Sequence, residues 1–171
     1  MADSGMILAI DPGTDMSAYV AVRHNGREIV EILSHGKVKN GQMYSVLDDF
    51  LGAELAVEMV ASYGMAVGAE VFETCVWIGR LLEYWRLGNP CAPSPTRIYR
   101  RDEKLCLCGT MAARDANITQ ALVDRYAPGQ PNRGKGTKKC PGFFYGFHAD
   151  VWQAMAVAVT YFDKHVRGVN F

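Results

Sequence analysis

Three short apolar runs, separated by turn residues, occupy the first forty positions of the chain. The first run, residues 7–10, ends in an acid, a proline and a glycine within the segment MILAIDPGTDMSAYVAV. Two more runs follow at 17–23 and 29–33, and the Asn-Gly pair at 25–26 between them is typical of a hairpin turn. The pattern therefore predicts a meander of three strands, the first of which ends in Asp11.

Helical and extended patterns alternate along the rest of the chain. Apolar side chains recur three or four residues apart in 43–53, which predicts an amphipathic helix. The same reasoning predicts further helices over 67–87, over 112–126 and in the closing segment VWQAMAVAVTYFDKHV, strands over 55–60 and 96–99, and a long glycine-rich loop over 127–147. This order predicts one α/β domain over residues 1–171, with a mixed sheet flanked by helices.

Composition narrows the classes to which the chain can belong. Its 171 residues carry a formal net charge of zero, and the sequence contains no run of eighteen consecutive apolar residues. The opening residues MADSG lack the basic and then apolar pattern of a secretory signal, so we expect a cytoplasmic protein without a membrane anchor. Five irregularly spaced cysteines predict free thiols. A zinc site built from Cys106, Cys108, Cys140 and His148 is the weaker alternative.

Basic side chains gather in two segments. They are Arg97, Arg100, Arg101 and Lys104 in the first, and Arg133, Lys135, Lys138 and Lys139 in the second. Each segment is either a solvated surface or a patch that contacts phosphates, and charge alone does not decide between the two.

Three carboxylates stand in apolar surroundings. Asp11 ends the first strand, Glu58 lies within the fourth, and Asp150 begins the last helix. Each has an ordinary explanation by itself, as a turn residue, a residue on the exposed face of an edge strand, and a helix cap. If the three meet at one point, however, their mutual repulsion calls for a cation. Together they indicate a site for a divalent metal ion.

The same residues carry a family resemblance. The segment ILAIDPGTDMSAYVAV resembles the first two strands of the RuvC family of Holliday-junction resolvases, which belongs to the ribonuclease H-like superfamily. LAVEMVASYG resembles that family's fourth strand, and HADVWQAMAVAVT resembles its last helix. SYGMAVGAEVFETCVWIGRLLEYW and GKGTKKCPGFFYG look closer to phage-encoded members. The resemblance implies a ribonuclease H-like, five-stranded mixed sheet flanked by helices.

The resemblance also implies a set of catalytic residues. Asp11, Glu58 and Asp150 match the acids that bind metal in the family. Gln153 stands where the family usually has a second metal-facing group on the last helix, and His148 is an alternative ligand nearby. Oxygen ligands select Mg²⁺ or Mn²⁺, and two ions per active site would suit phosphodiester hydrolysis.

The expected function is that of a structure-selective DNA endonuclease that cleaves Holliday junctions and other branched DNA, leaving a 5′ phosphate and a 3′ hydroxyl. A homodimer would match the two-fold symmetry of a four-way junction. Tyr63 and Phe72 are candidates for stacking on unpaired bases, although both could be ordinary core aromatics. The basic residues Arg100, Arg101, Lys104, Arg133, Lys135, Lys138 and Lys139 are candidates for contacts with DNA. The expected place of action is the cytoplasm of a bacterial cell or a phage-infected host.

Other functions remain open from the sequence. A non-catalytic module that binds branched DNA with the same fold is the main alternative, and the neutral Gln153 favours it. The substrate could instead be a three-way branch, a flap or a replication fork. An actin-like ATPase fragment would also have an acid, a glycine and a threonine after a strand, but such proteins need two domains to enclose a nucleotide.

Overall fold

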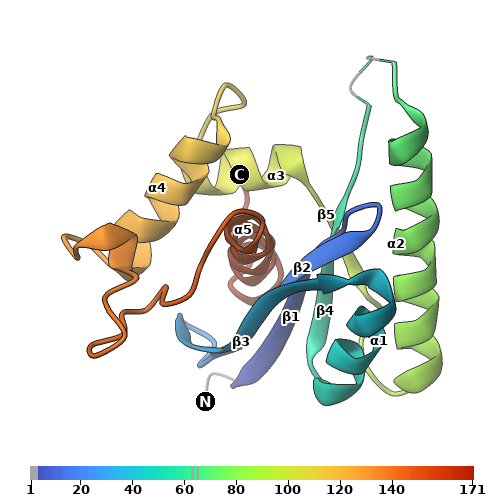
Figure 1. Ribbon diagram of the computed structural model, residues 1–171, viewed down its shortest axis with the longest axis horizontal. Coiled ribbons are helices and arrows are strands. Elements are labelled where there is room, and N and C mark those ends of the chain that lie inside the picture. The colour runs from blue at the N-terminus through green and yellow to red at the C-terminus, as the bar shows by residue number, and fades with distance from the viewer. Residues whose placement is uncertain (1–3, 63, 65) are drawn as a thin grey trace.

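A five-stranded mixed sheet forms the centre of the computed structural model, which describes residues 4–62, 64 and 66–171 (Figure 1). Its strands lie in the order β3-β2-β1-β4-β5. The first three are antiparallel neighbours, and β4 runs parallel to β1 on one side and to β5 on the other. The mixed sheet expected from the sequence is confirmed. The bounds are β1 Gly5–Asp11, β2 Met16–His24, β3 Ile29–Lys39, β4 Glu54–Met59 and β5 Thr96–Tyr99.

Helices cover both faces of the sheet. Helices α1 and α2 pack on one face, and α5, with α3 and α4 behind it, packs on the other (Figure 1). Their bounds are α1 Asn40–Asp49, α2 Ala69–Gly88, α3 Arg100–Cys108, α4 Asp115–Tyr126 and α5 Val151–Tyr161, and α5 continues as a π-helical turn over Phe162–Val166. None of the helices in the described ranges has both the length and the apolar character that crossing a bilayer requires.

Strand β1 explains how one apolar run serves two cores. Successive side chains of a strand point to opposite faces. Ile7 and Ala9 accordingly pack toward α5, while Leu8 and Ile10 pack toward α1 and α2. Because β1 is covered on both sides, all four residues are fully buried and the run shows no polar alternation. The same alternation places Asp11 on the face of the sheet that α5 covers.

Helix α5 is enclosed on nearly every side. Each of its residues from Val151 to Tyr161 is buried except Gln153. A helix that is apolar all round is stable only inside a protein, and here the sheet lies on one side of α5 and α3 and α4 lie on the other. The surroundings of α5 therefore fix the position of its first turn.

Several boundaries differ from the expected ones. Strand β3 continues to Lys39 rather than ending at residue 33, so α1 begins at Asn40 and ends at Asp49 instead of spanning 43–53. Helix α3 was not expected at all, because its sequence RRDEKLCLC has no apolar periodicity. The helix expected over 112–126 begins at Asp115, after this extra helix.

The loop over 127–147 is anchored rather than detached from the core. Phe144 and Phe147 are buried, and a 3₁₀ turn spans Asn132–Gly134. Gly134 has a φ of +71°, and a Cβ atom there would lie 2.3 Å from the Cβ of Ala127. A glycine is therefore required where this loop crosses the end of α4.

Candidate active site

Two of the predicted acids meet at the ends of neighbouring strands. Strands β1 and β4 are parallel, and Ile10 pairs with Val57, so the next residues in register are Asp11 and Glu58. Both side chains lie on the α5 face, since Ala9 and Ala56 two residues earlier pack there. Their carboxyl groups lie close enough for each to shift the pKa of the other. The sequence-predicted pair is thus brought together at the carboxyl ends of two buried strands.

The two carboxyl groups are held in a setting that opposes their ionisation. Burial raises the pKa of Asp11 to about 8, and the nearby charges of Glu58 and Asp150 add to the rise. Burial also raises the pKa of Glu58 to about 7, with the charge of Glu103 as the next cause. Without a cation between them, the two carboxyl groups therefore keep their protons to higher pH than free carboxyl groups do.

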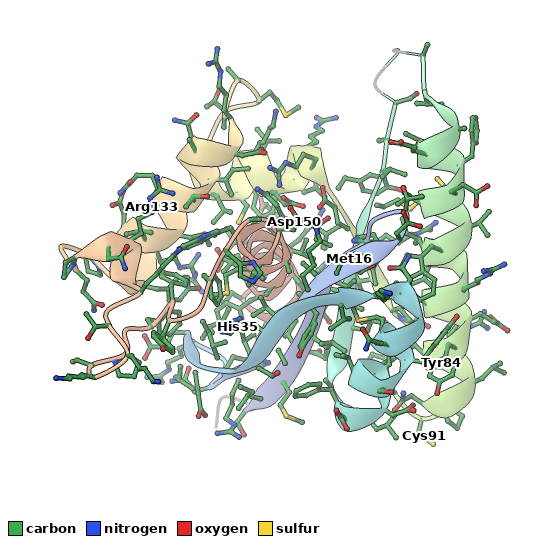
Figure 2. All side chains as sticks on the ribbon, viewed as in Figure 1. Met16, His35, Tyr84, Cys91, Arg133 and Asp150 are labelled. Carbon is green, nitrogen blue, oxygen red and sulfur yellow. The ribbon has the colours of Figure 1, made fainter. Side chains whose placement is uncertain are left out.

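Asp150 lies close to this pair and has a cation of its own. It immediately precedes α5 (Figure 2), and its charge contributes to the raised pKa of Asp11. Its carboxylate forms an ion pair with the Nζ atom of Lys37. The register explains this partner, because Asp11 pairs with Ala18 and Ala18 pairs with Lys37, which puts all three on one face. Lys37 is a site residue that the sequence pattern does not predict.

Gln153, one turn into α5, contacts Arg100. The Nη1 atom of Arg100 donates to Oε1 of Gln153 and, at 2.5 Å, to Oε2 of Glu103. Its Nη2 atom donates to Oδ1 of Asp115, the first residue of α4. Arg100 therefore differs from the other members of its basic cluster: its side chain is only 22% exposed, and three side chains from α3, α4 and α5 hold its charge at the acidic site.

Glu103 is a further acid at the site, and the sequence pattern does not predict it. Its side chain is 0% exposed, and its Oε1 atom has no hydrogen-bond partner among the described residues. Burial raises the pKa of Glu103 to about 7, against the effect of Arg100, and the charge of Asp11 adds to the rise. The run RRDEK looks solvated, so no sequence signal separated this glutamate from its neighbours.

The donor set suits a hard divalent cation. As the side chains stand, no group of three or more His, Cys, Asp or Glu residues in the described part of the chain is arranged to hold a metal ion. Asp11 and Glu58 nevertheless supply adjoining half-buried carboxylates whose repulsion a divalent ion would remove, and Asp150 lies near them. Oxygen donors of this kind match Mg²⁺ or Mn²⁺. The residues therefore fit the ion that the resemblance implies.

The structure does not bring the other predicted ligand and stacking residues to the acids, or does not describe them. His148 is exposed and lies near His35, whose Nε2 atom is 3.0 Å from the carbonyl oxygen of Tyr145. Among the described residues, His148 forms no ion pair with an acid. Phe72 is 61% exposed on α2, so it is not a core aromatic, and Tyr63 lies outside the described residues.

Among the described residues, no ion pair joins the remaining candidate basic residues to Asp11, Glu58 or Asp150. Arg101 is exposed on α3, and Lys104 lies 3.4 Å from the carbonyl oxygen of Met111. Figure 2 shows Arg133 well apart from Asp150, on the side of the molecule where the loop follows α4. In that loop, Lys138 and Lys139 are exposed at a turn closed by Thr137 and Cys140, and Lys135 is half-buried. The contact of these residues with DNA stays a prediction.

The cysteines do not form the alternative zinc site. All five are free, and Cys106 donates to Asp163 at 3.5 Å while Cys140 is exposed in the loop. Burial raises the pKa of the Cys106 thiol to about 12, which opposes the thiolate form that binds zinc.

Comparisons with known proteins agree with this architecture. A Thermus thermophilus RuvC structure superposes with a TM-score of 0.68 at 18% sequence identity, over 95% of this chain and 96% of that one. The chain has a RuvC-like fold. A structure described as T. thermophilus RuvC in complex with Holliday junction substrate also matches this RuvC-like chain, with a TM-score of 0.68 and 16% identity over 96% of each chain. No family model and no curated protein sequence matches.

Proposed function

We propose that this RuvC-like chain is a divalent-metal-dependent endonuclease that cleaves Holliday junctions and other branched DNA. The observation that carries the proposal is the adjoining pair of Asp11 and Glu58, half-buried at the ends of parallel strands with Asp150 close by. An acid pair that costs stability and gains nothing from the fold itself is typical of a catalytic site. The RuvC fold supports the choice of reaction.

Each side chain at the site has a defined task. Asp11 and Glu58 would hold the cation. Asp150 would become a third ligand, and its ion pair with Lys37 would break when the cation binds. When bound, Mg²⁺ or Mn²⁺ supplies positive charge to a phosphate and lowers the pKa of water. Lys37, once released from Asp150, would be available to pair with a DNA phosphate. The products would carry a 5′ phosphate and a 3′ hydroxyl.

The proposed partner is a four-way junction bound by a homodimer. One of the similar structures is described as a complex with Holliday junction substrate, and the two-fold symmetry of a dimer would match that of the junction. Arg101, Lys104, Arg133, Lys135, Lys138 and Lys139 would contact phosphates, and Phe72 and Tyr63 would stack on bases. A single domain over 1–171, a phage-type origin and action in the cytoplasm belong to the same proposal.

Cleavage of a labelled four-way junction tests the proposal. We expect nicking with Mg²⁺ or Mn²⁺, none with EDTA, and a loss of at least about a hundredfold in Asp11→Asn, Glu58→Gln and Asp150→Asn. Asp49→Asn, an exposed aspartate on α1, is the matched control and should cleave like the wild type. A panel of three-way branches, flaps and forks identifies the preferred substrate. Cleavage that is indifferent to metal and to all three substitutions would contradict the proposal.

A non-catalytic module that binds branched DNA is the second candidate. Two positively charged side chains of the chain itself favour this candidate, because Lys37 already pairs with Asp150 and Arg100 already contacts the neutral Gln153. Junction binding in a gel-shift assay, without nicking in either metal, would support this candidate over the nuclease.

A further inference from the structure

Arg100 occupies the part of the acidic site that Gln153 lines. If the proposed function holds, on which this inference rests, we propose that Arg100 is a built-in cation that takes the place of one of two divalent ions. The site would then take a single ion, held by Asp11, Glu58 and Asp150. The first support is position: Ile98 faces α5, and Arg100, two residues later, continues the chain from β5 into α3 beside the same acids.

The second support is the way in which Arg100 is held. Glu103, Asp115 and Gln153 come from three different helices, and each accepts a hydrogen bond from the one guanidinium. Burial alone would lower the pKa of Arg100, but the charges of Glu103 and Glu58 outweigh it and raise the pKa further. The group therefore stays charged at any pH at which the protein folds.

The third support is a contrast between the two positively charged side chains near the acids, Lys37 and Arg100. The ion pair of Lys37 and Asp150 is a single contact, and its side chains are 34% and 41% exposed. Water can solvate both partners there, so a divalent ion can displace the lysine at little cost. The pair of Arg100 and Glu103 is 22% and 0% exposed, and losing the guanidinium would leave a buried charge unpaired. An incoming ion would therefore displace Lys37 and not Arg100.

The fourth support is the chemistry of Gln153. Its amide oxygen is neutral, and it already accepts a hydrogen bond from Arg100. The contacts among the described residues use three of the five N–H donors of the guanidinium. The others can serve an anionic oxygen of a phosphate, which a guanidinium binds well. Arg100 can thus supply the positive charge that a second ion would otherwise supply.

Electron paramagnetic resonance of Mn²⁺ tests this proposal independently of cleavage. The wild-type chain, free and with a four-way junction bound, is expected to hold one Mn²⁺ that is lost in Asp11→Asn, and no spin-coupled Mn²⁺ pair. The coupled signal is the readout for a second ion because single Mn²⁺ ions bound to the DNA itself would be counted with those bound to the protein. In the double variant Arg100→Gln with Gln153→Asp, the number of ions is expected to rise from one to two, with a coupled signal.

Two further variants keep the result interpretable. Glu103→Gln added to the double variant removes the buried charge that Arg100 balances, so a folded chain is available even if the double variant unfolds. Arg86→Gln, the same change at a side chain on α2 that is 67% exposed, is the control and should bind one ion.

The outcomes separate the two proposals. A coupled pair in the wild type would overturn the role of Arg100 and leave the proposed nuclease standing. The absence of any ion that depends on Asp11 would overturn both. A folded variant without Arg100 that still gains no second ion would also overturn the role of Arg100.

Discussion

Asp11 occupies a position at which a carboxylate costs the fold stability. It follows four fully buried apolar residues, adjoins Glu58, and has a pKa of about 8. If residue 11 served only to form the turn after β1, asparagine would stabilise that turn as well as aspartate does. We therefore expect Asp11→Asn to raise the free energy of unfolding in EDTA at pH 8 by about 1–2 kcal/mol, the range seen when a functional strain is removed.

Urea denaturation measures this change, with Asp49→Asn as a control that should alter stability little. Addition of Mg²⁺ should stabilise the wild type and leave Asp11→Asn unchanged, because the proposed site would bind the ion only in the folded chain with both acids present. A variant that is less stable than the wild type in EDTA would show that the carboxylate supports the turn instead.

The raised pKa of Asp11 also predicts how stability depends on pH. The unfolded chain releases this proton near pH 4, whereas the folded chain keeps it until about pH 8. Between those values the folded state binds more protons, so the free energy of unfolding falls as pH rises, by at most about 1.4 kcal/mol per pH unit for each proton. Glu58 adds to the fall up to about pH 7.

Urea denaturation in EDTA at pH 5, 6.5 and 8 checks this slope. We expect the slope to be smaller in Asp11→Asn and smaller still when Glu58→Gln is added. An unchanged slope in both variants would mean that other groups determine it.

At the scale of elements, the turn between β1 and β2 is fixed by Ser17. Its Oγ atom accepts hydrogen bonds from the indole of Trp77 at 2.9 Å and from the backbone of Gly13 at 3.4 Å, and it donates to Asn40 at 2.8 Å. These bonds join α1 and α2 to the turn that follows Asp11. The end of β1 that carries Asp11 is thus positioned by the helices on the opposite face of the sheet.

Ser17→Ala should therefore lower both stability and metal affinity. Loss of the hydroxyl leaves the buried indole N–H of Trp77 without its acceptor, which costs about 1–3 kcal/mol. Thermal denaturation with and without Mn²⁺ measures both effects. Ser34→Ala is the control, since its hydroxyl bonds only one described side chain, Tyr19, at 3.1 Å. A stable variant with wild-type metal affinity would contradict the role of this network.

Elements differed in how far the sequence could predict them. Strands β1 and β4 were predictable because their short apolar runs, and the acid at or near the end of each, are visible in the sequence. Helix α3 was not, because its buried contact is the pair of Arg100 and Glu103, and a charge buried by pairing looks like a solvated charge. The partner of Asp150 was missed because residues 34–39 were not expected to extend β3.

For the whole molecule, the formal net charge is zero, so attraction to DNA must come from local patches. Lys138 and Lys139 are exposed at the tip of a loop whose base is anchored by Phe144. Changing both lysines to alanine should weaken junction binding and lower the salt dependence of the binding constant by about two in the log–log slope.

Fluorescence anisotropy at several salt concentrations measures this slope. Binding of Mn²⁺ should be unaffected, because the loop tip is separate from the acids. Arg86→Ala serves as the control, with a slope like that of the wild type. An unchanged slope in the double lysine variant would exclude this loop from the DNA interface.

The register of β3 has a consequence for the charge of the site. Ala21 pairs with Ser34 but Val22 pairs with Ile32, so Leu33 is an extra residue in the strand. In a regular ladder continued from Ile32, Gly36 instead of Lys37 would face Ala18, and the lysine would turn toward α1 and α2. One bulged residue at the edge of the sheet therefore decides whether Asp150 meets an ammonium group or faces water.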